Sequence, residues 1–189
     1  SFSRRRRRVA EVTHTHQKIE SYNIPVHSLG MKQGIPSLRS IWDLKKLICK
    51  LKPDLIQGWM YHGNVAASLA RFLYGQDKVK LLWNVRASMS NFEKRLTYAV
   101  INLGARLSKY ADRVIYNSFT SQREHRILNY DTNNSTVIPN GFETEIFKPD
   151  SMARSNIRKE LGLQEHVFLV GQIARYHPVK GHVTFLEAA

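Results

Sequence analysis

The stretch KPDLIQGWMYHGNVAASLARFLYG, from Lys52 to Gly75, decides the fold. Its first part predicts a strand over Asp54 to Met60, because four to eight largely apolar residues are typical of a strand covered on both faces. Its second part predicts a helix that is capped by Asn64 and ends at Tyr74, where Gly75 supplies the stop. A strand followed by a helix is the repeating unit of a parallel α/β sheet.

The same alternation continues on both sides of this unit. Further strands are predicted at Ile24 to Leu29, Val79 to Val85, Arg113 to Asn117, Ser135 to Ile138 and Val167 to Ile173. Further helices are predicted at Ser37 to Leu51, from Asn91 to about Lys109, from about Ser121 with Glu124 at capping-box spacing, and from Asp150 or Ser151 to Leu161 with Gly162 behind it. The predicted fold class is therefore α/β, with a doubly wound parallel sheet of the Rossmann type.

The helix expected over Ser37 to Leu51 is amphipathic. Its apolar stripe is made of Leu38, Ile41, Leu44, Ile48 and Leu51, and its basic residues lie largely off that stripe: Arg39, Lys45, Lys46 and Lys50. Two interpretations stay open for the basic face. It is either an ordinary solvated helix face or a contact with the anionic headgroups of a membrane.

Composition limits the class of protein. Apolar residues make up 42% of the chain and aromatic residues 10%, which is typical of a globular protein and too rich for a disordered one. The longest apolar stretches fall far below the roughly 18 residues that cross a bilayer. The basic N-terminal region lacks the apolar segment of a secretory signal. Cys49 is the single cysteine, so an intramolecular disulfide is excluded, and a reducing cytoplasmic setting is favoured.

The charge is strongly positive, with 29 Lys and Arg against 15 Asp and Glu, a formal net charge of +14. Such a charge attracts phosphates of nucleotides, anionic lipids or nucleic acid. A basic nucleic-acid-binding module is thus one alternative function. It would need aromatic and basic residues interleaved on one surface, and that pattern is not evident outside the run Arg4 to Arg8. Nucleic acid is therefore not the expected partner.

Ligands of a parallel α/β sheet bind beyond the carboxyl ends of its strands. The residues at those positions are Tyr61 to Asn64, Arg86 to Ser88, Asn117 and Ser118, Asn140 and Gly141, and Ala174 to Gly181. Arg86 either faces a phosphate or carboxylate of a bound acceptor or pairs with a nearby acid. Asn140 either lines the cleft or shapes the turn, and Gly141 is expected to permit a positive φ angle.

A metal site is not expected. His14 and His16 flank Thr15, but a credible site needs three or four ligands, and two histidines at this spacing supply too few.

Five strings occur in a fixed order along the chain. They are KPDLIQGWMYHGN at Lys52 to Asn64, ADRVIYNS at Ala111 to Ser118, VIPNGFETEIFKPD at Val137 to Asp150, RKELGL at Arg158 to Leu163, and VGQIARYHPVKGHVTFLEAA at the end. Together they resemble the family 4 glycosyltransferases, a retaining group with the GT-B fold. The resemblance covers roughly residues 19 to 189.

The resemblance implies two Rossmann-type domains and metal-independent transfer without a cofactor. The expected reaction moves a hexose from a nucleotide diphosphate sugar to a glycan or lipid-linked acceptor with retention of configuration. It also implies a cytoplasmic protein, peripheral at the inner face of the plasma membrane if the basic helix face contacts lipid. An alternative of the same fold is a nucleotide-sugar 2-epimerase, against which VIPNG followed by ARYHPVKG argues.

Three residues match functional positions of that family. Arg175 and Lys180 match its paired Arg and Lys, which contact the donor diphosphate. Two fixed cations would stabilise the charge that the leaving diphosphate gains as the glycosidic bond breaks. His62 is placed like the family's acceptor-domain histidine and is the catalytic candidate, as a group that positions a sugar hydroxyl.

The resemblance divides the chain into three parts. Residues 1–18 form a basic leader that aligns with nothing in the family, residues 19–149 a partial N-terminal acceptor domain, and residues 150–189 the start of a donor domain. The Gly-rich loop and the Glu-x7-Glu element of the family are not found. We therefore expect a fragment, incomplete at both ends and inactive by itself, that is poorly soluble or loosely structured beyond about residue 150.

Overall fold

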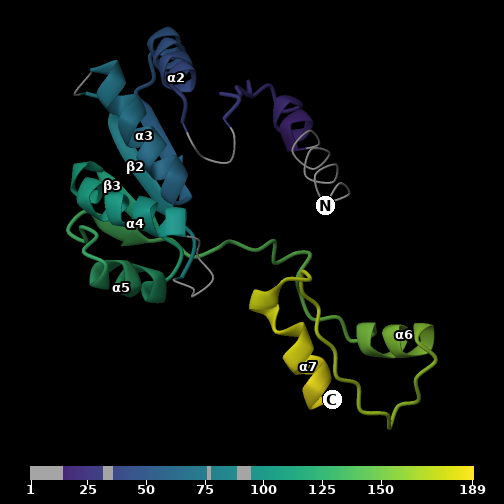
Figure 1. Ribbon diagram of the computed structural model, residues 1–189. Helices are drawn as coiled ribbons and strands as arrows, with labels where there is room; N and C mark the ends of the chain where they lie inside the picture. The colour runs from purple at the N-terminus through teal and green to yellow at the C-terminus, as the bar shows by residue number, and fades with distance from the viewer. Residues whose placement is uncertain (1–14, 32–35, 76–77, 89–94) are drawn as a thin grey trace.

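The computed structural model describes residues 15–31, 36–75, 78–88 and 95–189 (Figure 1). Arg4 to Arg8, His14 and Asn91, which the sequence singles out, lie outside these residues. The chain forms an α/β fold around a parallel sheet, which confirms the predicted fold class.

The sheet has four strands in the order β1-β2-β3-β4, and every neighbouring pair is parallel. The strands are β1 (Leu55–Trp59), β2 (Lys80–Val85), β3 (Arg113–Tyr116) and β4 (Ser135–Val137). In register, Trp59 lies beside Asn84 and Val85 lies beside Tyr116. Four of the six predicted strands are thereby confirmed to within one residue at each end.

The described helices lie before, between and after the strands. They are α2 (Leu38–Leu51), α3 (Met60–Tyr74), α4 (Arg95–Leu107), α5 (Phe119–Ile127), α6 (Ala153–Glu160) and α7 (His182–Ala188), with 3-10 turns at Ser108–Tyr110 and Pro178–Lys180; residues 15–20 are also helical. α3 packs on β1, β2 and α4, and α5 packs on β3 and β4. Figure 1 shows α6 and α7 apart from the sheet, beyond an extended connection.

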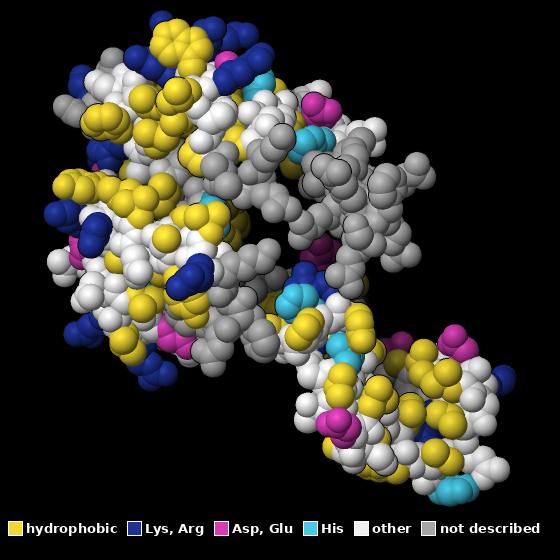
Figure 2. All heavy atoms as spheres, viewed as in Figure 1, with side chains coloured by type: hydrophobic (Ala, Val, Ile, Leu, Met, Phe, Trp, Pro, Cys, Tyr) yellow, Lys and Arg dark blue, Asp and Glu magenta, His cyan; other side chains and the backbone are white. Residues whose placement is uncertain are grey.

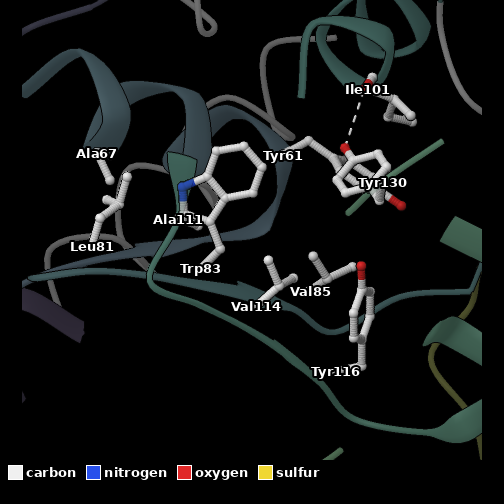
Figure 3. Packing of buried hydrophobic residues seen from close by; sticks show 10 residues of the cluster. All are labelled: Tyr61, Ala67, Leu81, Trp83, Val85, Ile101, Ala111, Val114, Tyr116 and Tyr130. Atoms are coloured by element: carbon white, nitrogen blue, oxygen red, sulfur yellow. Dashed lines mark hydrogen bonds between the residues drawn. The ribbon is translucent and has the colours of Figure 1, made fainter. Parts of the chain in front are cut away.

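The core lies between the sheet and the helices α3 to α5 (Figure 3). Strand β2 contributes Trp83 and Val85, both fully buried, and β3 contributes Tyr116. Full burial of such side chains stabilises the fold by about 1.5–3 kcal/mol each. The hydroxyl of Tyr130 donates to the backbone oxygen of Ile101 at 3.1 Å, so this aromatic ring fastens α4 to the core.

Asn64 does not cap α3, contrary to the expectation. The helix begins four residues earlier at Met60, whose φ of 60° makes a sharp turn directly after β1. The Asn64 amide instead accepts from the backbone N–H of Asn84 at 3.3 Å and donates to its oxygen at 3.4 Å. Asn64 thereby continues the β1–β2 ladder after β1 has ended. Gly58 permits this approach, because a Cβ there would lie 2.6 Å from the Cα of Asn64.

Two other helix starts differ from the expectation. α5 is capped by Ser118, whose hydroxyl accepts from the N–H of Ser121 at 3.1 Å, so the cap lies three residues before the predicted one. α6 begins at Ala153, and Asp150 accepts from the N–H of Met152 at 2.8 Å just before the helix. Side-chain acceptors with equivalent spacing compete for such positions, and tertiary packing selects among them.

Two predicted strands do not form. Residues 24–29 and 167–173 belong to no strand of the described sheet. Phe168 is 90% exposed and Ile173 is fully exposed. A β-branched run becomes a strand only where a neighbouring strand completes its hydrogen bonds, and neither segment pairs with one.

Candidate functional site

The carboxyl ends of the four parallel strands form one edge of the sheet. β1 ends at Trp59, β2 at Val85 and β3 at Tyr116. The N–H of Ile138 donates to the oxygen of Tyr116 at 2.8 Å, so the residues after β4 reach the same edge. Polar residues that follow the strands are therefore brought together here, as expected for a ligand site in this architecture.

Arg86 lies at this edge and contacts groups from two other parts of it. Its Nη2 donates to Oδ1 of Asn140, and its guanidinium carbon lies 5.6 Å from the ring centroid of Trp59. Its backbone N–H contacts the sulfur of Met60 at 3.4 Å. The structure thus joins two predicted residues, Arg86 and Asn140, that are 54 positions apart. Among the described residues, Arg86 forms no ion pair with an acid.

Trp59 was not predicted as a site residue. The apolar pattern placed it inside a buried strand, whereas its side chain is 55% exposed at the strand end. Its position near the end of the predicted strand, before the predicted helix, is the sequence feature that could have indicated a site residue.

Gly141 does not adopt the positive φ angle that the sequence predicted for it. Residues 138–143 belong to no helix, strand or turn. No atom lies within 4 Å of a Cβ built at Gly141, and the residue is exposed. Asn140 therefore acts through its bond to Arg86 rather than through a turn.

Asn117 and Ser118 follow β3 at the same edge. Ser118 is used as the cap of α5, and Ser121 donates its hydroxyl to the oxygen of Ala87 at 2.7 Å, which ties α5 to the loop after β2. The Oδ1 atom of Asn117 is buried and accepts no hydrogen bond from the described residues. His62 lies exposed in the first turn of α3, immediately beyond the Met60 turn.

Arg175 and Lys180 lie on the loop that precedes α7, and both are exposed. The loop is braced by its own contacts: His182 bonds the oxygen of Arg175 at 3.0 Å, and Gln172 donates to the oxygen of Lys180. Neither cation forms an ion pair within the described part of the chain. Their charges are therefore held on one short loop without a neutralising carboxylate.

The family model described as Glycosyltransferase Family 4 matches residues 2–146. The chain belongs to this glycosyltransferase family. A stretch of 53 residues is 32% identical to EpsF, a candidate glycosyltransferase of Bacillus subtilis (strain 168), and covers 28% of this chain and 14% of EpsF.

Crystal structures of Anabaena HepE share the glycosyltransferase fold of this chain. The HepE complex with UDP has a TM-score of 0.69 at 24% identity and covers 91% of this chain and 46% of HepE. The HepE complex with UDP-glucose has a TM-score of 0.67 at 23% identity, with 91% and 45% covered. The chain thus spans less than half the length of the HepE structures that it matches.

In this glycosyltransferase chain the predicted site residues fall into two groups. Arg86, Asn140 and His62 lie at the ends of the sheet strands, and Arg175 and Lys180 lie on the loop before α7, which Figure 1 shows apart from the sheet. Their joining in one site stays a prediction.

His125 is a buried polar residue that the sequence analysis did not identify. Because its Nδ1 lies 2.7 Å from the oxygen of Ser121, which can only accept, Nδ1 carries the proton. Its Nε2 then accepts from the Tyr61 hydroxyl at 3.1 Å. Burial lowers the pKa of His125 below 6.5, so the ring is held neutral. Rings of Tyr61, Tyr116 and Tyr130 surround it, which makes it part of the core rather than of the ligand edge.

Two further features are absent from the described residues. No group of three or more His, Cys, Asp or Glu side chains there could hold a metal ion. None of the described helices combines the length and apolar character needed to cross a membrane.

Proposed function

We propose that the protein transfers a hexose from a nucleotide diphosphate sugar to a glycan or lipid-linked acceptor, with retention of configuration and without a metal ion or other cofactor. In this reaction the bond between the anomeric carbon and the diphosphate oxygen breaks, and the electron pair leaves with the nucleotide. The oxygen of an acceptor hydroxyl bonds to the anomeric carbon, and the proton of that hydroxyl passes to the departing diphosphate oxygen. The family match carries the proposal and favours it over the 2-epimerase alternative.

The donor diphosphate is assigned to Arg175 and Lys180. Two exposed cations on one braced loop suit a group that gains negative charge as the bond breaks. The HepE relatives hold UDP and UDP-glucose, which supports a uridine nucleotide as the probe.

The acceptor is assigned to the strand edge of residues 19–149. His62 is exposed there and can accept a hydrogen bond from a sugar hydroxyl. Residues 150–189 would contribute the donor side, in keeping with the position of Arg175 and Lys180.

UDP binding tests the donor assignment. We expect the variants Arg175→Gln and Lys180→Gln each to bind UDP about 10- to 100-fold more weakly in isothermal calorimetry, because a hydrogen bond to a charged group contributes roughly 1.5–3 kcal/mol. Lys159→Gln is the matched control, since Lys159 is an exposed cation of the neighbouring helix α6. Failure of the wild-type chain to bind UDP, or equal losses in all three variants, would contradict the assignment.

Helix α2 is proposed to contact an anionic membrane. Leu38, on the predicted apolar stripe, is 88% exposed, and Trp42 is 57% exposed one turn later. Lys46 lies 5.5 Å from the Trp42 ring centroid, and Arg39, Lys45 and Lys50 are also exposed. Figure 2 shows hydrophobic and basic side chains side by side over α2, at the top of the view. Basic residues around an exposed aromatic ring suit lipid headgroups above an apolar boundary.

A further inference from the structure

Among the described residues, three arginines have partly or fully buried side chains with hydrogen-bond partners: Arg71, Arg86 and Arg158. Arg71 donates from Nη1 to the oxygen of Tyr110 at 2.9 Å and to Oδ2 of Asp112 at 3.2 Å. Arg158 donates to backbone oxygens, including that of Gln164 at 2.6 Å, and also lies near the carboxylate of Glu165. In both cases several oxygen atoms, one of them in a carboxylate, surround the guanidinium.

Arg86 has no carboxylate among its contacts in the described part of the chain. Its side chain is held by one amide oxygen, from Asn140, and by the face of Trp59 at 5.6 Å. Neither partner carries a charge, and no acid of the described residues pairs with it. A guanidinium has five N–H donors, and the bond to Asn140 uses one of them. Among the described residues, the guanidinium is therefore positioned by uncharged partners, and no acid compensates its charge.

The position of Arg86 in the fold indicates that its guanidinium faces a ligand site. It follows β2 at the carboxyl edge of the sheet, where ligands of parallel α/β folds bind. Asn117 follows β3 at the same edge, and its buried Oδ1 accepts no hydrogen bond from the described residues. A cation and an acceptor that follow neighbouring strands at one edge of the sheet suit a ligand that carries both an oxyanion and a hydroxyl group.

We infer that Arg86 binds an oxyanion of the acceptor, a phosphate or a carboxylate, so that the acceptor is an anionic sugar. The inference rests on the proposed transferase function. Trp59 and Asn140 are positioning residues that hold the guanidinium in place. A planar guanidinium binds either oxyanion through two parallel hydrogen bonds, which a lysine ammonium cannot reproduce.

The test titrates the protein with glucose 1-phosphate, glucuronate and glucose, followed by the NMR signals of the arginine Nε–H and tryptophan indole groups. We expect at least one of the two anionic sugars to bind 10-fold or more tightly than glucose, and the better one identifies the oxyanion. The variant Arg86→Gln should remove this preference, and Arg86→Lys should restore it only in part. Arg113→Gln is the matched control, because Arg113 is an exposed arginine at the opposite end of the neighbouring strand β3.

Binding of UDP to the same variants separates this inference from the proposed function. We expect Arg86→Gln to keep the wild-type UDP affinity and the wild-type melting temperature. If UDP binds but neither anionic sugar is preferred over glucose, this inference fails and the donor assignment stands. Equal weakening of anionic-sugar binding by Arg86→Gln and Arg113→Gln would also overturn the inference. It would likewise be overturned if Arg86→Gln lost UDP binding but kept the preference for an anionic sugar, because Arg86 would then be a donor residue.

Discussion

At the scale of single residues, His125 links the packing of the core to pH. Its folded pKa lies below 6.5 because the ring is buried, so the unfolded chain takes up a proton first as the pH falls. The buried neutral His125 therefore causes no loss of unfolding free energy above about pH 6.5. As the pH falls from there toward the folded pKa, the unfolding free energy decreases by up to about 1.4 kcal/mol per pH unit. We expect the urea concentration at the midpoint of unfolding to be lower at pH 5.5 than at pH 7.5. This difference should be smaller in the variant His125→Gln.

The variant His166→Gln is the control for this pH effect, because His166 is exposed. It should keep the pH dependence of the wild type. His125→Gln should be less stable at pH 7.5, since it disturbs the contacts to Tyr61 and Ser121. A pH dependence that is unchanged in His125→Gln would show that other groups cause it.

At the scale of elements, α2 has two apolar sides, one packed in the fold and one exposed. The exposed side carries Leu38 and Trp42 among basic residues. We expect the protein to sediment with vesicles that contain anionic phosphatidylglycerol and not with neutral phosphatidylcholine vesicles. Replacing Lys45, Lys46 and Lys50 with Gln should weaken binding strongly, because each basic residue near such a surface contributes about 1 kcal/mol. The variant Trp42→Ser should weaken it further.

Phe72→Ser serves as the control for the vesicle experiment. Phe72 is 81% exposed on α3 and lies in a different apolar surface, which includes Leu103 and Tyr110. Its replacement should leave vesicle binding unchanged. Equal sedimentation with neutral and anionic vesicles would exclude the proposed role of the basic face of α2.

At the scale of the whole molecule, the sheet and the segment after residue 150 differ in how much apolar surface they bury. The central strands hold fully buried residues such as Trp83, whereas Phe168, Val170 and Ile173 are exposed. Figure 2 shows hydrophobic side chains gathered on the smaller lobe, at the lower right of the view. We expect amide hydrogen exchange over residues 168–173 to be at least 100-fold faster than at Trp83 and Val85, because few backbone contacts protect that segment.

Exchange at Leu161 and Leu163 is the internal reference, since their N–H groups donate to Ile157 and Arg158 at 3.0 and 2.8 Å. These amides should be protected although they lie in the same part of the chain. Slow exchange throughout residues 168–173 in a monomeric sample would contradict the expectation that this segment is loosely structured.

The sequence by itself determined the type and order of the main elements. Four strands and the helices between them follow from local apolar periodicity, and Gly75 and Gly162 do adopt the left-handed backbone expected after a helix. The strings shared with family 4 also indicated the correct family. These features depend on residues close together in the chain, so a local pattern suffices to predict them.

Only the tertiary structure decided which groups meet. Asn64 bonds to Asn84 instead of capping a helix. Arg86 meets Asn140, which follows β4, and Trp59 at the end of β1. The segments 24–29 and 167–173 form no strands for the same reason. A hydrogen-bonding group takes whichever partner the fold brings within reach, and that partner is distant in sequence.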